Sequence, residues 1–290
     1  ASMIPLADSS CTFCGECVNV CPVGAIVGVS YVKDVWKAIN DPTKTVIVQT
    51  APAVRVAIGQ EYGFKPGEPV TGKLVAGLRR LGFDKVFDTD FSADLTIMEE
   101  GHELVERVKA GKNLPILTSC CPGWINFLEH HYPDLLDIPS SCKSPQQMFG
   151  AIAKTYYAEK IGVKPEDLVV VSIMPCQAKK YEAARPEFAP NGVWDVDYVV
   201  TTRELGAMLH EAGVNLANLE DEEYDSPLGE STGAGVIFGV TGGVLEAALR
   251  SVHTMLTGEN LAGDAINFRA VRGLDGVKEA KVEVAPGMTV

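Results

Sequence analysis

Residues 118–124 read Thr118-Ser119-Cys120-Cys121-Pro122-Gly123-Trp124, and the rest of the chain is interpreted outward from this stretch. An apolar run at 114–117 precedes it and is predicted to be a buried strand, whereas 125–131 has the pattern of an amphipathic helix. Neighbouring cysteines rarely meet the geometry of a disulfide. A turn at a helix N-terminus stabilises negative charge and therefore favours thiolates. The stretch is a candidate site for a metal or for a reactive thiol.

A second cysteine stretch lies downstream and reads Met174-Pro175-Cys176-Gln177-Ala178-Lys179-Lys180-Tyr181-Glu182. It follows an apolar run at 168–173 that is predicted to be a strand. Two strand ends that each deliver cysteine indicate a site at the carboxyl edge of a parallel sheet.

The chain alternates between strand and helix patterns from residue 45 onward. The expected strands are 45–49, 85–88, 168–173 and 194–200, and the expected helices are 51–61, 71–81, 95–109, 145–161 and 201–212. Such alternation predicts an α/β domain with a mostly parallel sheet. The glycine-rich segment 229–243 is expected to be a tight loop or a place where backbone approaches a cofactor closely.

Composition limits the classes of partner. The chain has 290 residues, a net charge of −13 and a pI of about 4.9, which argues against nucleic acid or an anionic membrane as the main partner. No run approaches the roughly 18 apolar residues that a membrane-spanning helix needs, so we expect no membrane insertion. Because no signal peptide opens the sequence, a cytoplasmic location is expected.

Four of the eight cysteines fall within eleven positions. Residues 11–22 read Cys-Thr-Phe-Cys-Gly-Glu-Cys-Val-Asn-Val-Cys-Pro, which is the complete bacterial-ferredoxin spacing for a 4Fe–4S cluster. Disulfides and a zinc site are the alternatives, and the crowding and the terminal proline fit both poorly. Cys11, Cys14 and Cys17 are expected to bind one cluster, and Cys21 a second cluster whose other ligands lie upstream of residue 1.

The two cysteine stretches resemble the first two signature motifs of the FeFe-hydrogenases. Segments 94–100, 143–147 and 201–205 also resemble that family, in the same order. The resemblance implies a mostly parallel α/β H-cluster domain over 31–290, preceded by a partial bacterial-ferredoxin-like iron–sulfur module over 1–30. It also implies an H-cluster, which is a 4Fe–4S cube joined to a diiron subsite with carbonyl, cyanide and azadithiolate ligands.

The resemblance assigns roles residue by residue. Cys121 and Cys176 are similar to two ligands of the cube, Cys120 to the thiol that exchanges protons with the azadithiolate, and Lys179 to the partner of a cyanide. The residues that resemble the wall and polar support of the pocket are Pro52, Ala53, Ser144, Gln146 and Met174. Many relatives have serine at the position of Ala53, so one hydrogen bond to a cyanide is expected to be lost.

A proton path is also implied. Glu100, Glu103 and Arg107 share one face of an expected helix, and with Ser140 they match the family's route from Cys120, through a water, to the surface. A solvated charged face is the alternative for these three residues. Cys142, where many relatives have alanine, is expected to be a small buried hydrophobe rather than a ligand.

The family's third motif, with two more cysteine ligands, has no counterpart, because no cysteine follows Cys176. We expect the sequence to be a fragment, since it starts Ala1-Ser2-Met3 and residues 281–290 have the pattern of half a hairpin.

The functional hypothesis is a hydrogenase catalytic subunit that interconverts protons, electrons and H₂. Its 4Fe–4S clusters would relay electrons to ferredoxin or to NAD(P)-linked subunits of a multi-subunit complex. The alternatives are a hydrogen sensor, an iron–sulfur assembly factor and a plain electron-transfer protein. Cys120 and Lys179 favour the enzyme, since sensors commonly lack that thiol and assembly factors depart from the lysine motif.

Overall fold

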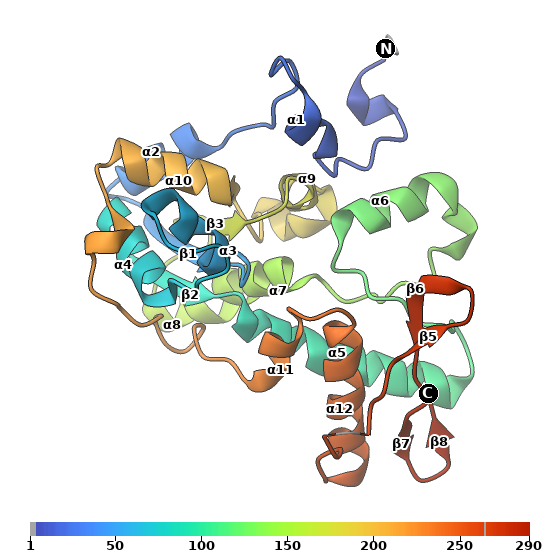
Figure 1. Cartoon of the computed structure of the whole chain (residues 1–290). Helices are drawn as coiled ribbons and strands as arrows, with labels where there is room; N and C mark the ends of the chain where they lie inside the picture. Colours follow the sequence, from blue (N-terminus) through green and yellow to red (C-terminus); the bar gives the residue numbers. More distant parts are fainter. Residues whose placement is uncertain (1–3, 264) are drawn as a thin grey trace.

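The computed structural model describes residues 4–263 and 265–290, so Ala1-Ser2-Met3 lie outside the described residues. Its centre is a four-stranded parallel sheet in the order β2-β1-β3-β4 (Figure 1). The strands are β1 Thr45–Thr50, β2 Lys85–Asp88, β3 Leu168–Met174 and β4 Tyr198–Thr201. The predicted α/β class with a mostly parallel sheet is confirmed.

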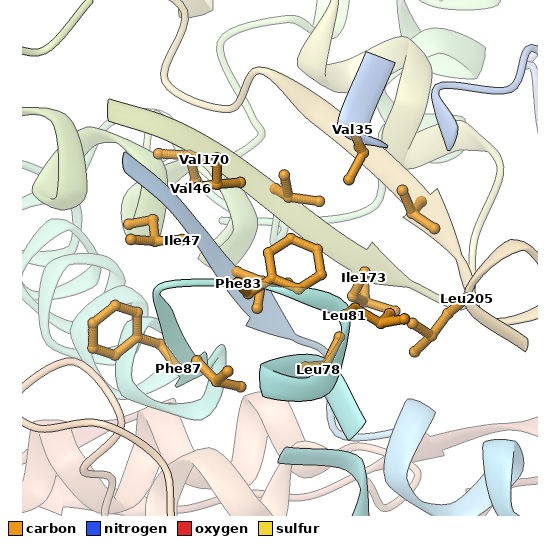
Figure 2. Close-up of a cluster of buried hydrophobic side chains, with 14 of the residues drawn as sticks. Val35, Val46, Ile47, Leu78, Leu81, Phe83, Phe87, Val170, Ile173 and Leu205 are labelled. Atoms are coloured by element: carbon orange, nitrogen blue, oxygen red, sulfur yellow. The ribbon is translucent and has the colours of Figure 1, made fainter. Parts of the chain in front are cut away.

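The strands β1 and β3 are buried along almost their whole length, as their Val- and Ile-rich sequences require of central parallel strands. Their register pairs Val46 with Val169 and Thr50 with Ile173. Figure 2 shows the apolar side chains that fill the space around this sheet, with Phe83, Phe87 and Leu205 among them. The Phe87 ring packs on Phe149 at 5.7 Å between ring centroids. This core holds the carboxyl ends of β1 and β3 side by side.

Helices cover the sheet on both sides, with α2 and α10 on one side and α7 and α8 on the other (Figure 1). The helices are α1 Glu16–Val20, α2 Val32–Ile39, α3 Val54–Ala57, α4 Thr71–Leu81, α5 Asp90–Ala110, α6 Pro122–His131, α7 Pro145–Ile152, α8 Ala158–Ile161, α9 Ala178–Ala183, α10 Thr202–Glu211, α11 Gly233–Ile237 and α12 Gly243–Thr257. Within the described ranges, no helix is long and apolar enough to cross a membrane.

Local sequence explains several helix ends. Gly82, with φ of 103°, ends α4 in the left-handed region that glycine tolerates. Thr201 and Glu204 form a reciprocal capping box at the start of α10. Ser144 caps α7, and Pro145 occupies its first turn, where the missing N–H costs nothing.

The end of the chain forms a second, smaller unit against α5. Helix α12 packs on α5, and the cluster Leu104, Leu249, Val252, Val282 and Val284 joins them to the last hairpin. Two antiparallel pairs are present there, β5 Arg269–Val271 with β6 Leu274–Glu279 and β7 Glu283–Ala285 with β8 Met288–Thr289. The expectation of half a hairpin is wrong, because Val282 and Val290 exchange both backbone hydrogen bonds and close a whole one.

The expected buried strand at 114–117 is also wrong. Leu114 and Leu117 are 46% and 38% exposed, and Leu117 makes only an isolated parallel bridge with Pro139. Pro115 has no N–H to donate to a ladder, so the segment runs as a surface loop. The Cys120-Cys121 turn therefore follows a loop, and only the second cysteine stretch follows a sheet strand.

Other boundaries differ in detail. The helix expected at 145–161 is broken by a π-helical segment, Ala153–Tyr157. The helix expected at 51–61 is a short α3 followed by a 3₁₀ helix, Ile58–Tyr62. The glycine-rich segment contains α11 and the start of α12 rather than one continuous loop.

Candidate active site and iron–sulfur module

The cysteine pair lies at the start of α6. Cys121 is extended, with φ of −93° and ψ of 108°, and Pro122 begins the helix. Cys121 is exposed and Cys120 is half-buried. Burial raises the pKa of the Cys120 thiol, while the nearby Lys179 ammonium acts in the opposite direction. Cys120 is therefore a proton-bearing thiol at neutral pH. Its neighbour Cys121 is not in a disulfide, so its sulfur is available as a metal ligand.

Cys176 follows the carboxyl end of β3. Met174 is the last, buried residue of that strand, and α9 begins at Ala178. Directly after the adjacent strand β1, the backbone N–H of Ala51 donates to the Ile173 carbonyl at 3.0 Å, so Pro52 lies in the turn beside it. Cys176, Met174 and Pro52 thus share the edge that the sequence predicted, whereas Ala53 is exposed at the start of α3.

Lys179 connects the two cysteine stretches. Its Nζ donates to the Cys120 carbonyl at 2.8 Å and pairs with Glu182 Oε2 at 3.0 Å. Ser144 Oγ and Gln146 Nε2 also donate to Glu182 Oε2, at 3.0 and 2.9 Å. Three predicted site residues therefore converge on one carboxylate that is only 5% exposed. The sequence interpretation gave Glu182 no role, although its i,i+3 spacing from Lys179 signals the pair.

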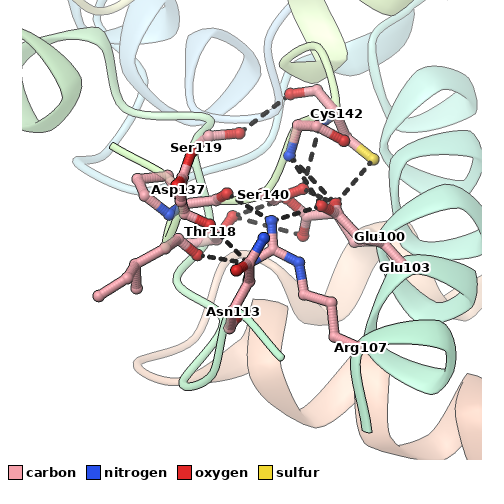
Figure 3. Close-up of polar contacts among 12 residues, drawn as sticks. Glu100, Glu103, Arg107, Asn113, Thr118, Ser119, Asp137, Ser140 and Cys142 are labelled. Atoms are coloured by element: carbon pink, nitrogen blue, oxygen red, sulfur yellow. Dashed lines mark hydrogen bonds and ion pairs between the residues drawn. The ribbon is translucent and has the colours of Figure 1, made fainter. Parts of the chain in front are cut away.

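A second set of hydrogen-bonded polar residues joins α5 to the loop after α6 (Figure 3). Ser140 Oγ donates to Glu103 Oε2 at 2.7 Å, and Arg107 Nη2 donates to Glu103 Oε1 at 2.6 Å. The Arg107 guanidinium also donates to backbone carbonyls of Asn113, Asp137, Ile138 and Pro139. These bonds fix the guanidinium, so the Glu103 carboxylate is held rather than left as a solvated surface charge.

Thr118 lies between this group and the cysteine pair. Its Oγ1 is 3.2 Å from Glu100 Oε1 and 3.8 Å from Cys120 Sγ. Here the hydroxyl stands between the thiol and Glu100, where the family resemblance implies a water. The sequence interpretation gave Thr118 no role. Its position two residues before Cys120 is the feature of the sequence that could have indicated one.

The pKa values of Glu100 and Glu103 are shifted in opposite directions. Burial raises the pKa of Glu100, which is 8% exposed, while hydrogen bonds from the Thr118 and Ser140 hydroxyls act against it. Burial also acts to raise the pKa of Glu103, but hydrogen bonds from Ser140, Ser141 and Arg107 outweigh it and lower the pKa. The inner carboxyl therefore holds a proton more readily than the outer one.

Cys142 is in polar contact with the same group. It is half-buried, its N–H donates to Ser140 Oγ at 3.1 Å, and its Sγ lies 3.7 Å from Glu103 Oε2. Burial raises the pKa of this thiol to about 11, so it stays protonated. The expectation of a small buried hydrophobe is corrected, because the sulfur faces a carboxylate.

The cysteines of residues 11–21 have surroundings that suit the iron–sulfur clusters implied by the sequence. All eight cysteines are unbridged. The N–H of Phe13 donates to Cys11 Sγ at 3.4 Å, and backbone N–H groups of Ile26, Val23 and Ala25 lower the pKa of Cys21. Amides aimed at sulfur fit thiolate ligands of iron–sulfur clusters. Cys14 and Cys17 are exposed, and among residues 4–263 and 265–290 no three potential ligands are already gathered for a metal.

The residues around Gln146 also suit a bound polar group. The buried Gln146 carbonyl oxygen, Oε1, has no hydrogen-bond partner among the described residues, although the side chain is only 1% exposed. Gln49 Nε2 donates to the Gln146 backbone carbonyl at 3.0 Å and holds the residue in place. Soft thiolates at Cys121 and Cys176 with a cationic Lys179 form a donor set that suits an iron–sulfur group with anionic ligands.

Two family models match the chain. The model described as "Iron only hydrogenase large subunit, C-terminal domain" matches residues 44–290. The model described as "4Fe-4S binding domain" matches residues 6–27.

Curated relatives and a solved structure agree with these matches. The NADP-reducing hydrogenase subunit HndD of Solidesulfovibrio fructosivorans is 61% identical over 96% of this chain and 48% of its own length. The periplasmic [Fe] hydrogenase large subunit of Nitratidesulfovibrio vulgaris is 50% identical over 97% of this chain and 74% of its own. The structure of an apo [FeFe]-hydrogenase HydA1 variant from Chlamydomonas reinhardtii is 50% identical, with a TM-score of 0.76 over 88% of this chain and 65% of that one.

More distant matches include the cytosolic iron–sulfur assembly component 3 of Bos taurus, at 33% identity over 82% of this chain. The chain spans about half the length of HndD and of this assembly component.

Proposed function

The chain belongs to the iron-only hydrogenase large-subunit family, with a 4Fe–4S module ahead of its H-cluster domain, and from this premise we propose that it is part of a catalytic subunit that interconverts protons, electrons and H₂. The observation that carries the proposal is the run of proton-bearing groups from Cys120 through Thr118 and Glu100 to Ser140, Glu103 and Arg107. An electron-transfer protein needs no such run.

The H-cluster, when bound, supplies the electrons and the place where hydrogen is formed or split. Cys120 Sγ would hold the proton at the cluster end of the route, because burial keeps the thiol protonated. The Thr118 hydroxyl both accepts and donates, so it passes the proton between Cys120 Sγ and the Glu100 carboxyl.

The outer half of the route begins at Glu100, whose raised pKa lets the carboxyl take up a proton. The Ser140 hydroxyl then links it to Glu103, whose carboxylate is kept ionised by Arg107. A carboxyl that accepts protons beside one that releases them suits repeated transfer in either direction. Arg107 closes the route at the loop of residues 137–139.

Cys121 and Cys176 are the proposed ligands of the cube, and Lys179 is the proposed donor to a cyanide. The contact of Lys179 with the Cys120 carbonyl supports this, since one cation then reaches both cysteine stretches. Pro52, Ser144, Gln146 and Met174 would line the pocket, with Ala53 at its rim. No cysteine follows Cys176 in this sequence, which thus supplies two of the proposed cysteine ligands of the cube.

The proposed electron route runs from the H-cluster to the cluster of Cys11, Cys14 and Cys17, and from there toward the cluster of Cys21. The similarity to an NADP-reducing hydrogenase subunit supports NAD(P)-linked partner subunits or ferredoxin as acceptors in a multi-subunit complex. Because pools of nicotinamide nucleotides are intracellular, we propose a cytoplasmic location, although one relative is periplasmic.

The test is isotope exchange by the full-length, matured subunit under H₂ in D₂O, followed by mass spectrometry. We expect HD and D₂ to form, and we expect Cys120→Ser to reduce the rate by about 100-fold or more at normal iron content, because serine is a far weaker acid. An unchanged exchange rate in Cys120→Ser would remove the proposed proton path.

A further inference from the structure

The iron–sulfur module touches the catalytic domain at the residues that follow the two candidate ligand cysteines. Asn126 on α6, five residues after Cys121, donates from Nδ2 to the Cys11 carbonyl at 2.9 Å. Tyr181 on α9, five residues after Cys176, stacks on Phe13 with 4.8 Å between ring centroids. The loop of the module cysteines is therefore held by the same two helices that follow the pocket cysteines (Figure 1).

Gln177 also contacts the iron–sulfur module. It directly follows Cys176 in the chain, so it is nearer in sequence to a candidate ligand than Asn126 or Tyr181. Its side chain lies between two glycines of the module. A Cβ added at Gly28 would lie 2.7 Å from Gln177 Oε1, and one added at Gly15 would lie 2.8 Å from Gln177 Cβ. A side chain at Gly28 would therefore displace the Gln177 amide, which is the flexible end of that side chain, whereas one at Gly15 would meet Gln177 Cβ and Cγ close to the backbone.

The two glycines differ in what else they require. Gly15 lies between Cys14 and Cys17 and has φ of 83°, so its backbone conformation alone favours glycine. Gly28 has no such requirement, so a Cβ there is opposed by the Gln177 amide, which would have to move aside. A cavity of about 350 Å³ adjoins this contact and is lined by Cys11, Cys17 and Gln177 among others. The Gln177 side chain thus reaches the wall of the space beside the module's own cysteines.

We propose that Gln177 is a positioning residue that sets the separation and orientation of the module cluster relative to the cluster ligated by Cys176, and through them the rate of electron transfer between the two. This proposal rests on the proposed function. One covalent step joins Cys176 to Gln177, and one packing contact joins Gln177 to the loop of Cys14 and Cys17. Electron transfer through protein slows steeply with distance, so a small displacement at this contact changes the rate.

The experiment uses the full-length, matured subunit with three variants, Gly28→Ala, Gln177→Ala and the double variant. Gly233→Ala is the matched control, because Gly233 also has an ordinary φ and a Cβ there meets open space. Two quantities are measured after photochemical reduction of the module cluster. One is the rate at which the H-cluster infrared bands respond, and the other is the magnetic interaction between the clusters in the EPR spectrum.

We expect Gly28→Ala to displace the Gln177 amide, and thereby to slow the electron transfer and weaken the magnetic interaction relative to Gly233→Ala, with iron content unchanged. The double variant should be no slower than Gln177→Ala alone, since the added methyl then fits the space that Gln177 vacates. Equal rates in Gly28→Ala and Gly233→Ala, or fully additive losses in the double variant, would overturn the proposal.

Two further outcomes are distinguishable. If Gly28→Ala loses its module cluster, Gln177→Ala alone still decides the matter, because an unchanged rate there contradicts the positioning role. A wild-type protein without carbonyl and cyanide bands would remove the proposed function. The module's EPR signal would then test the contact on its own, through a change in Gly28→Ala that is reversed in the double variant.

Discussion

Ser140 Oγ lies 2.7 Å from Glu103 Oε2, and this bond ties the loop after α6 to the middle of α5. The same carboxylate accepts a bifurcated bond from the Ser141 N–H, with both of its oxygens at 3.1 Å, and pairs with Arg107. A carboxylate with this many donors is a fixed part of the structure rather than a solvated charge. The relation between Ser140 and Glu103 therefore makes α5 part of the candidate site.

Replacement of Glu103 tests the outer half of the proposed proton path. We expect Glu103→Gln to lower hydrogen evolution by about 100-fold or more, because the amide cannot relay a proton in the way a carboxylate does. Glu106→Gln is the control, since Glu106 is an exposed glutamate on the same helix. Hydrogen evolution is measured by gas chromatography at matched iron content, and equal activities of the two variants would argue against the path.

Replacement of Thr118 tests the inner half. Thr118→Val removes the hydroxyl between Cys120 and Glu100 but keeps the branched shape, so we expect hydrogen evolution to fall about 10- to 100-fold. Thr118→Ser keeps the hydroxyl and should retain most of the activity. If valine and serine behave alike, a water rather than Thr118 carries the proton there.

Replacement of Glu182 tests what orients Lys179. Glu182→Gln leaves the Lys179 ammonium without its carboxylate in a poorly exposed place, so the free energy of unfolding should fall by about 3 kcal/mol. Glu187→Gln, which affects a pair with Arg185 whose glutamate is 49% exposed, should cost less than about 1 kcal/mol. Urea unfolding of both variants measures the two changes in the free energy of unfolding. Equal changes would show that the Lys179–Glu182 pair contributes no more to stability than the exposed pair.

Asp90 predicts a pH dependence of stability. Its side chain is 3% exposed, and burial, with Asp88 nearby, raises its pKa to about 6, although Arg55 acts in the opposite direction. Between about pH 4 and 6 the folded state binds more protons than the unfolded state, so the free energy of unfolding falls as the pH rises through this window.

The loss from Asp90 is complete above about pH 6 and amounts to about 3 kcal/mol for a shift of roughly two pKa units. Asp90→Asn should flatten this part of the profile. Urea unfolding of the metal-free subunit at intervals from pH 4.5 to 7.5 measures it. A variant that keeps the wild-type slope would assign the pH dependence to other groups.

The central fold could be predicted from sequence because its signals are local. The buried strand 168–173 and the helix 71–81 with Gly82 at its end follow directly from apolar runs and helix-end residues. The prediction of a buried strand at 114–117 was wrong, because an apolar run in the sequence does not show whether other residues pack on it. Leu114 and Leu117 lie on the surface, and only the tertiary structure reveals this.

The site was predictable where the motif itself carries the residue. The shared helix face of Glu100, Glu103 and Arg107 follows from spacing alone. Glu182 and Thr118 were missed because their roles arise from contacts between segments, Glu182 with Ser144 and Thr118 with Glu100. The contact of Gln177 with Gly28 joins residues far apart in the chain and has no signal in the local sequence.

The most direct test of the account is infrared spectroscopy of the full-length, matured subunit in the carbonyl and cyanide stretching region. The account predicts bands in this region that shift when hydrogen is admitted, and it predicts their loss when both Cys121 and Cys176 are replaced by alanine. A region without bands in a protein that retains its iron–sulfur absorbance would contradict the assignment of a hydrogenase site.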